Sequence, residues 1–434
     1  MDRRRVSAWA PRRAIAAWAL WDCGSTGMNA IVATFVFSVY LTNSVGHGLG
    51  GDTSPASWLG RALTVSGIAV ALLAPLVGVL VAAPRRRRVA LVVLTALAVF
   101  FTAAMSLIRA DPRYLFPGLA LLALTAACGD LASVPYNAML RQLCTPRTAG
   151  RVSGLGWAAG FSGSVLLLLV VYFGFIQGDG PRRGLLGIPA DDGLNVRAAM
   201  IMAALWLVVF ALPLLLTARV AGDEPVKPIP GPLRAYRQLW SDLREEWRRD
   251  RNLVYYLVVS AVFRDGLAGV FAFGAVLGVS VYGISQADVL IFGVIASSVA
   301  AIGAVAGGRL DDRIGAKPVI VASLATMLVA GVALLALSGP RAFWVCGLLL
   351  CLFIGPIQSA ARTLLLRMTG EGKEAVIFGL YTMTGRAVAF LAPWLFFVFA
   401  DRFHTDRAGL AGILTVLLVG LLGMLAVRVP AHAR

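Results

Sequence analysis

Twelve long apolar stretches, separated by short polar segments, run along this chain of 434 residues. A helix needs roughly 20 consecutive apolar residues to cross a hydrocarbon core about 30 Å thick, and the stretches reach that length. The pattern therefore predicts an all-α membrane protein with twelve transmembrane helices. The predicted spans cover residues 14–42, 57–83, 88–108, 114–139, 149–176, 196–219, 252–280, 286–309, 317–338, 342–366, 374–399 and 408–428.

Positive charge alternates between the two sides of these spans. Lys and Arg in short loops stay on the cytoplasmic side of a membrane. Of the 39 basic residues, 27 gather on the side of the N-terminus and 8 fall on the other side. We therefore expect a multi-pass protein of the plasma membrane with both termini cytoplasmic. The net charge of +17 then reflects topology and contact with anionic lipid. Without a basic soluble domain it does not indicate nucleic-acid binding.

The longest polar stretch, residues 220–251, divides six spans from six. It opens with four prolines, which helix interiors exclude. Apolar residues then recur at three- and four-residue steps, which predicts an amphipathic helix on the cytoplasmic membrane surface. A solvated linker helix is the alternative. These apolar residues are Leu233, Tyr236, Trp240, Leu243 and Trp247. The expected units are a six-helix bundle at 1–219, the linker at 220–251 and a second bundle at 252–434.

The two six-span segments carry an internal repeat. Gly154-Leu155 followed by Gly160 recurs 225 residues later as Gly379-Leu380 followed by Gly385, in matching spans. Two six-span units related in parallel are the architecture of major facilitator transporters. The sequence therefore predicts two pseudo-symmetric six-helix bundles in the major facilitator fold.

A second repeated element lies between the second and third span of each bundle, and it resembles the facilitator loop pattern G-x-L-x-D-R-x-G-R-K. Aspartate can bond the free amides at the start of a neighbouring helix, so the resemblance implies a latch that holds one gate shut. A short basic turn that only fixes orientation is the alternative. The second bundle matches at Gly308, Leu310, Asp312, Arg313, Gly315 and Lys317. The first bundle keeps Gly78, Leu80, Arg86 and Arg87, but Ala82 replaces the aspartate.

Ionisable residues inside the spans are costly in a bilayer and normally face the bundle interior or a water-filled path. The charged candidates lie mostly in the first and fourth spans of each bundle, and some polar residues share helical faces with them. We predict a substrate- and ion-binding site made of nine residues. They are Asp22, Asn29, Asp130, Asn137, Arg264, Asp265, Gln358, Arg362 and Arg386.

We expect the acids and arginines of this set to face each other across a cavity. Arg362 would bind a carboxylate with its two-pronged guanidinium, and Asp265 or Asp130 would receive a substrate amine or a proton. Fixed salt bridges that hold the bundles together are the structural alternative. The aromatic residues nearby are interpreted as core residues, with packing against substrate as the alternative. They are Tyr136, Trp157 and Tyr381.

Four segments resemble the vacuole effluxer family, the autophagy-related amino-acid effluxers of fungal vacuoles and their bacterial relatives. They are WALWD at 18–22 with TFVF at 34–37, YNAML at 136–140 with GRVSGLGW at 150–157, Asp265-Gly266, and GPIQSAAR at 355–362 with FGLY at 378–381. The resemblance implies the facilitator fold and an amino acid as the substrate, moved outward. Arg264 stands where the family commonly has a polar neutral residue, which leaves a different coupling ion or substrate charge open.

The predicted function is secondary active transport of a small polar metabolite by alternating access. An amino acid moved outward by a monomer is the best candidate, with protons as a candidate coupling ion. A drug/proton antiporter and a membrane sensor that keeps the fold without transport are the alternatives. We expect no enzymatic activity, cofactor or metal. The spans hold no Cys–His or Ser–His pair, and the Gly-x-x-x-x-Gly-Lys-Ser/Thr motif of nucleotide-binding loops does not occur.

Overall fold

The computed structural model describes residues 12–47, 53–178, 180–217 and 251–429, together with Tyr236, Arg237, Trp240, Ser241, Arg244 and Arg248. It contains twelve helices that are long and apolar enough to cross a membrane, which confirms the predicted count. Most of the surface helix predicted at 233–247 lies outside the described residues.

The helices of the first half are α1 (Arg12–Asn29), η1 (Ala30–Phe35), α2 (Phe37–Tyr40), η2 (Leu41–Val45), α3 (Pro55–Leu80), α4 (Pro84–Ala104), η3 (Met105–Leu107), η4 (Pro112–Tyr114), α5 (Leu115–Ala138), α6 (Leu140–Leu143), α7 (Ala149–Val171), η5 (Tyr172–Ile176), η6 (Asp191–Gly193) and α8 (Leu194–Thr217). Those of the second half are α10 (Arg251–Ser280), α11 (Gln286–Ile314), α12 (Ala316–Ala336), α13 (Pro340–Met368), α14 (Glu374–Val388), α15 (Leu391–Phe403) and α16 (Asp406–Ala426).

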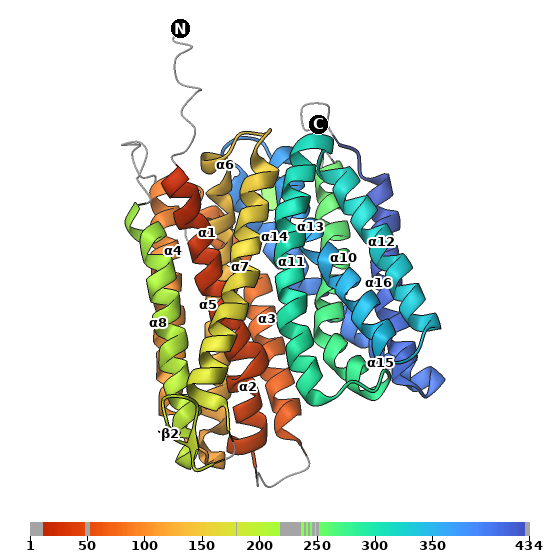
Figure 1. Ribbon diagram of the computed structural model, residues 1–434. Coiled ribbons are helices and arrows are strands. Elements are labelled where there is room, and N and C mark those ends of the chain that lie inside the picture. Colours follow the sequence, from red (N-terminus) through yellow and green to blue (C-terminus); the bar gives the residue numbers. More distant parts are fainter. Residues whose placement is uncertain are drawn as a thin grey trace.

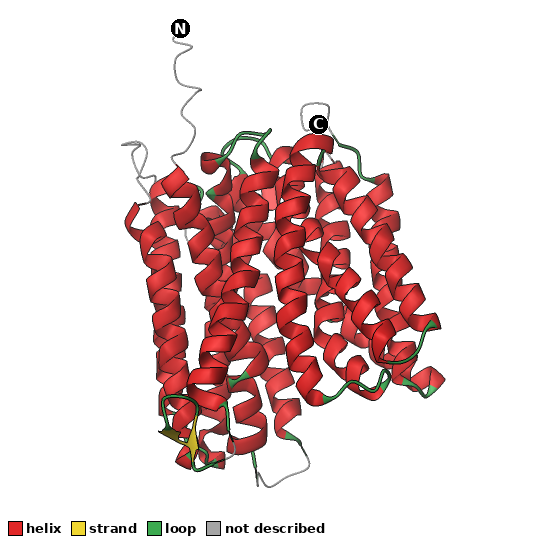
Figure 2. Ribbon diagram, in the orientation of Figure 1, coloured by secondary structure: helices red, strands yellow, loops and turns green. Residues whose placement is uncertain are grey.

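The bundle has two distinct ends. The helix α1 begins, and α16 ends, at the same end (Figure 1), as an even number of crossings requires. Arginines at the helix ends beside the connections before α4, α7, α12 and α14 lie there too, among them Arg85, Arg141, Arg313 and Arg367. We call this the basic end. At the opposite end the strands β1 (Arg182–Arg183) and β2 (Ile188–Pro189) form a small antiparallel hairpin between α7 and α8 (Figure 2).

The first and the eleventh span are not continuous α-helices, which the sequence pattern did not show. In the first span the backbone widens into the π-helical turns η1 and η2, and between η1 and α2 the Val36 amide donates to the Ile31 carbonyl at 3.1 Å. In the eleventh span α14 ends at Val388, and α15 begins at Leu391. Such interruptions free backbone groups inside the membrane, where buried side chains can bind them.

Large apolar side chains cover the outer surface of the bundle. Val65 and Ile68 on α3 are 66% and 57% exposed, and Val329 on α12 is 71% exposed. In a water-soluble protein so much exposed apolar surface would drive association. Here it is the surface that meets lipid tails, and the buried apolar side chains pack inside the bundle.

The two halves meet along two helix pairs, and glycines make both contacts close. In one pair α7 lies beside α11 (Figure 1), and Gly154 packs directly on the Ala304 carbonyl. In the other pair α14 packs on α3, and Gly379 lies against the Ala74 carbonyl. The two glycines that the repeat relates therefore occupy equivalent places in the two pairs. A side chain at either position would force the backbones apart.

This contact predicts a selective effect of adding one methyl group to α7. We expect Gly154→Ala to lower the thermal stability of the purified protein, because its Cβ would overlap the Ala304 carbonyl and overpacking costs about 1–3 kcal/mol. The matched control is Gly67→Ala on α3, where a Cβ meets no atom within 4 Å. Melting followed by intrinsic fluorescence in detergent measures both. Equal melting temperatures for the two variants would contradict this packing account.

Candidate substrate site and gate

A cavity of about 450 Å³ lies between the halves, enclosed by α1, α5, α7, α10, α13 and α14. All nine residues of the predicted binding site line it, although they come from five different helices. The side chains of Trp21, Ser25, Thr125 and Trp157 complete much of the wall. The charge is balanced, since the nine residues include three acids and three arginines. We describe these six charges in turn.

Asp22 and Arg362 form an ion pair across the two halves. Asp22 Oδ2 lies 3.5 Å from Arg362 Nη2, and the two residues are 9% and 5% exposed. The Arg362 guanidinium is surrounded by aromatic rings of the first half, at 5.1 Å from the ring centre of Trp157, 5.3 Å from Trp18 and 5.7 Å from Tyr136. Such cation–π contacts stabilise a partly desolvated guanidinium. Tyr136 and Trp157 are thus both packed in the core and part of the cavity wall.

Asp130 and Arg386 form a second ion pair between the halves, from α5 to α14. Their side chains are 25% and 41% exposed, much more than those of Asp22 and Arg362. Exposure to the cavity lets water reach this pair and weakens it relative to a buried one. The two ion pairs between the halves therefore differ. The Asp22–Arg362 pair is enclosed by aromatic rings, whereas the Asp130–Arg386 pair is exposed to water in the cavity.

Arg264 and Asp265 are not paired with each other or, among the described residues, with any other charged group. Asp265 Oδ2 instead accepts a hydrogen bond from the Ala392 amide at 2.6 Å. Ala392 lies in the first turn of α15, so Asp265 caps the interruption in the eleventh span and complements the helix dipole there. Arg264 lies over the Tyr381 ring, with its Cζ 3.4 Å from the ring centre, and its Nη2 donates to the Tyr381 carbonyl at 2.8 Å.

Several buried polar atoms around the Asp22–Arg362 pair make no hydrogen bond to the described residues. Three are donors: Arg362 Nη1, Trp157 Nε1 and the Tyr136 hydroxyl. Two are acceptors: Asp22 Oδ2 and Asn137 Oδ1. Buried polar groups are normally hydrogen-bonded, and leaving one without a partner costs about 1–3 kcal/mol. Unused donors and acceptors of both kinds in one cavity point to a ligand that carries both kinds of group.

The basic end of the cavity is closed by the loop-pattern residues of the second half, of which Gly308–Arg313 lie in the last turns of α11. Asp312 Oδ1 accepts a hydrogen bond from the Gly150 amide at 2.8 Å, and Oδ2 accepts one from the Arg151 amide at 3.2 Å, so the carboxylate caps the start of α7. Arg151 Nε adds an ion pair to the same carboxylate at 2.8 Å. Gly308 packs against the Gly150 carbonyl, which brings the two helices into contact.

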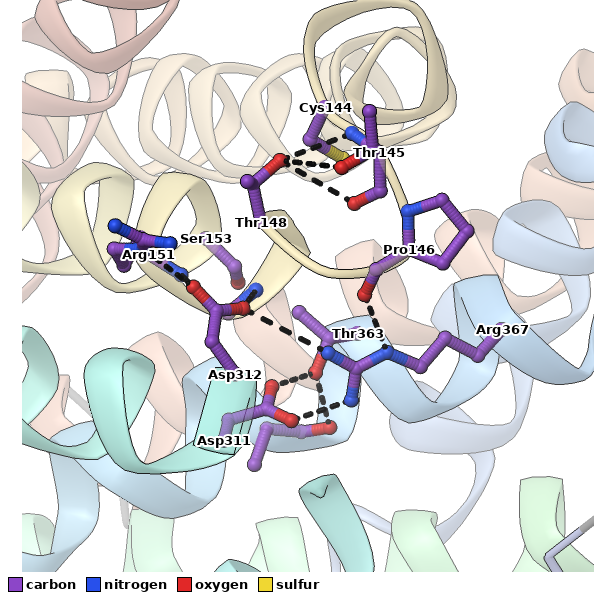
Figure 3. Close-up of polar contacts among 12 residues, drawn as sticks. Cys144, Thr145, Pro146, Thr148, Arg151, Ser153, Asp311, Asp312, Thr363 and Arg367 are labelled. Carbon is purple, nitrogen blue, oxygen red and sulfur yellow. Dashed lines mark hydrogen bonds and ion pairs between the residues drawn. The ribbon is translucent and has the colours of Figure 1, made fainter. Parts of the chain in front are cut away.

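A buried pair next to Asp312 strengthens this closure (Figure 3). Asp311 pairs with Arg367 and accepts a hydrogen bond from the Thr363 hydroxyl. Arg367 Nη2 lies 3.8 Å from Asp312 Oδ1, and its Nε donates to the Pro146 carbonyl of the first half at 3.3 Å. The two aspartates and one arginine therefore hold the segment before α7 against α11 and α13.

The remaining loop residues of the second half have other places. Lys317 Nζ donates to the Leu425 and Val427 carbonyls at 2.9 and 2.7 Å and so closes the end of α16. Arg313 is exposed beside a surface cavity of about 890 Å³ at the basic end.

The first half closes the basic end with different chemistry, because its loop lacks the aspartate. Glu374, in the first turn of α14, supplies the carboxylate from the other half. Its side chain is 4% exposed and pairs with Arg87 Nη2 at 3.2 Å and Arg141 Nε at 2.7 Å. Arg87 is buried as well, whereas for Arg86 the backbone amide donates to the Ala83 carbonyl at 3.0 Å. The first half therefore also has a latch, but its carboxylate comes from α14 and not from the connection between α3 and α4.

Sequence reasoning missed four residues of this gate: Arg141, Asp311, Arg367 and Glu374. In the sequence, Arg141 shares a helical face with Asp130 and Asn137, and Arg367 is a basic residue beside a short connection. Asp311 occupies a variable position of the loop pattern, next to Asp312. The signal for Glu374 was an acid at the start of the eleventh span, opposite the basic pair of a loop without its aspartate.

Comparison with known proteins agrees with this architecture. A family profile described as "Vacuole effluxer Atg22 like" matches residues 23–434. A Bacillus subtilis protein named as an uncharacterised MFS-type transporter, YxiO, is 20% identical over 406 residues, which are 93% of this chain and 92% of that protein. Autophagy-related protein 22 of Yarrowia lipolytica is 23% identical over 309 residues, 64% of this chain and 50% of its own length. The proton:xylose symporter XylE shares the fold with a TM-score of 0.67 at 14% identity, over 95% of this chain and 93% of its own.

The closed gate predicts that the thiol of Cys144, between α6 and α7, reacts slowly with alkylating reagents. Burial raises the pKa of the Cys144 thiol to about 12, against about 8.5 for a free thiol. We expect Cys144 to react with N-ethylmaleimide at pH 8 on the order of a hundredfold more slowly than a free cysteine. Its thiolate fraction is about three orders of magnitude smaller, and the greater nucleophilicity of a more basic thiolate offsets part of that loss. Its rate should rise about tenfold per pH unit from pH 7 to 9, because only the thiolate reacts. Asp312→Ala should speed the reaction by loosening the segment before α7.

Mass spectrometry of Cys144 measures these rates, with Cys144→Ser as the background. A rate that levels off between pH 8 and 9, or one that Asp312→Ala leaves unchanged, would count against the closed gate described here.

The second latch predicts a large effect of one charge. We expect Glu374→Gln to lower the free energy of unfolding by roughly 3–5 kcal/mol, because removing one partner of a buried pair leaves uncompensated charge. The control is Glu371→Gln, three residues earlier and exposed. The double variant Arg87→Gln/Glu374→Gln should recover part of the loss. Denaturant titration in detergent tests this, and equal losses for Glu371→Gln and Glu374→Gln would refute it.

Proposed function

Because the chain belongs to the vacuole effluxer Atg22-like family of major facilitator transporters, we propose that it is a secondary carrier for a small polar metabolite. The best candidate for that metabolite is an amino acid, moved out of the cell across the plasma membrane. Transport follows alternating access: the two halves rock about the central cavity and open it to one side at a time. The residues 1–219 and 252–434 are the two moving units.

The observation that carries this proposal is the set of unused donors and acceptors beside Arg362. A carboxylate accepts hydrogen bonds, and the three free donors there are a guanidinium, an indole and a phenol. An ammonium donates hydrogen bonds, and it could be bound by Asn137 Oδ1, which makes no hydrogen bond, and by Asp22 Oδ2, which makes only the 3.5 Å ion pair with Arg362. A zwitterion that offers both groups a few ångströms apart would satisfy the donors and acceptors of this cavity together.

The position of this site between the halves links binding to movement. Arg362 belongs to α13 of the second half, whereas Trp157, Tyr136 and Asp22 belong to the first. A bound zwitterion would insert into the Asp22–Arg362 pair, whose atoms are already 3.5 Å apart, and would replace a direct bond between the halves with its own bonds. A substrate shifts a carrier between two conformational states when it binds one state more tightly than the other. Bonds that bridge the two halves make its affinity depend on their relative position.

The size and charge of the cavity favour an amino acid over a large apolar drug. Small-molecule sites span about 300–1,000 Å³, and this cavity of about 450 Å³ lies in the lower part of that range. Six charged side chains line it. A hydrophobic cation would have to desolvate them without offering hydrogen bonds in return.

The orientation follows from the loops. With the basic end on the cytoplasmic side, as the distribution of Lys and Arg predicts, the two latches would close the cytoplasmic exit, and the structure would correspond to a state that is closed to the cytoplasm. Asp130 is the candidate proton-carrying group, because its pair with Arg386 is the more water-exposed of the two. Protonation of Asp130 would release Arg386 and weaken the contact between α5 and α14.

Counterflow in proteoliposomes tests the proposed function. We expect purified protein to exchange labelled amino acids, and Arg362→Gln to abolish exchange while the protein still folds. Trp157→Phe should raise KM about tenfold, because it removes one hydrogen bond to a charged group, worth about 1.5 kcal/mol or more. The control is Trp58→Phe, whose ring packs on Phe116 away from the cavity.

The same assay with and without a pH gradient tests coupling to protons, and Asp130→Asn should make exchange insensitive to the gradient. Exchange at wild-type rates by Arg362→Gln would exclude this residue from the site. Exchange of hydrophobic cations in place of amino acids would favour a drug antiporter.

A further inference from the structure

Arg264 is the one cation of the cavity for which the described part of the chain supplies no opposite charge. We infer that Arg264 holds a second anionic group of the substrate, so that the preferred substrate is a small amino acid with a side-chain carboxylate. This inference rests on the proposed function and adds to it a choice among amino acids.

The guanidinium of Arg264 is held in place by contacts that leave part of it free. Its Nε donates to the Ser260 carbonyl at 3.2 Å and its Nη2 to the Tyr381 carbonyl at 2.8 Å. Its flat face stacks on the Tyr381 ring. Because a guanidinium has five donors, Nη1 and the second hydrogen of Nη2 remain for a ligand. Arg264 lines the cavity, so these donors can be reached from it.

The other charges around Arg264 are already balanced. Arg386, on the same wall of α14, is paired with Asp130, and Arg362 is paired with Asp22. Asp265 is the remaining acid, and it binds the Ala392 amide. There it lies at the positive end of the α15 dipole, which offsets its charge. The wall formed by α10 and α14 therefore presents a net positive group to the cavity.

A glycine makes room for this arrangement. A Cβ at Gly385 would lie 2.6 Å from Arg264 Nη2 and 3.2 Å from its Cζ, too close for either atom to stay in place. Gly385 therefore leaves the space that the guanidinium occupies between α10 and α14 at the cavity wall. Arg264 is the binding group, and Gly385 leaves the space in which the guanidinium is positioned.

A carboxylate is the group that best matches these donors. An unpaired arginine inside a membrane protein is costly, and a carboxylate can accept two parallel hydrogen bonds from one guanidinium. An uncharged amide of the same shape could accept one such bond and would bring no charge. Glutamate and aspartate should therefore be preferred to glutamine and asparagine, with the α-carboxylate and ammonium at the Asp22–Arg362 pair.

Competition among these four amino acids in counterflow tests the inference. We expect wild-type protein to show a KM for glutamate at least tenfold below that for glutamine. Arg264→Gln should raise the KM for glutamate at least tenfold and change the KM for glutamine less than about twofold. Arg264→Lys should keep part of the preference. The control is Arg61→Gln, which removes a cation that lies over Trp58 near the start of α3, away from the cavity.

A second variant covers the case in which Arg264→Gln does not fold, as judged by gel filtration. Gly385→Ala keeps the charge but displaces the guanidinium, and it should also reduce the preference for glutamate. Equal KM values for glutamate and glutamine in wild-type protein, or equal losses for both in Arg264→Gln, overturn the inference and leave the proposed function standing. A lack of exchange for every amino acid overturns both.

Discussion

A charge that enters a bilayer must find an opposite charge, a hydrogen-bonding partner or water, because lipid tails offer none of these. That constraint explains the interior of this protein. Six ionisable side chains lie deep in the spans, and each is accounted for by a paired charge, a backbone amide, an aromatic ring or the cavity. The halves are consequently joined by ion pairs such as Asp22–Arg362, and these pairs are also the groups that a substrate would have to engage.

Closure of the basic end depends on a different principle, the close approach of helix backbones. Gly154 and Gly379 remove the side chains that would separate α7 from α11 and α14 from α3. Once the helices touch, carboxylates can reach across: Asp312 caps α7, and Glu374 is held by Arg87 and Arg141. The two latches occupy equivalent places in the α7–α11 and α3–α14 pairs. In the first pair the acid lies in the loop pattern at the end of α11, whereas in the second pair it lies on α14, across from the loop pattern. Opening this end requires breaking both buried networks together.

The sequence predicted the number of spans, the fold and the helices that line the cavity, because each follows from periodicity and from the cost of buried charge. It also identified nine of the residues that line the cavity, from Asp22 to Arg386. Their pairing could not be predicted, since it depends on distances between helices: Asp265 binds the Ala392 amide only because α14 and α15 are separated. Glu374 was missed for a related reason, as its partners lie more than 200 residues away in the chain.

Pulsed electron–electron double resonance between the two halves tests the central claim. The claim is that closure at one end of the bundle alternates with closure at the other end when substrate is bound in the cavity. Spin labels at Arg147 and Ile314 report on the basic end, and labels at Ser44 and Ser280 report on the opposite end; all four residues are exposed. The account predicts that saturating amino acid lengthens the first distance and shortens the second in the same fraction of molecules. A basic-end distance that stays fixed while substrate binds would contradict it.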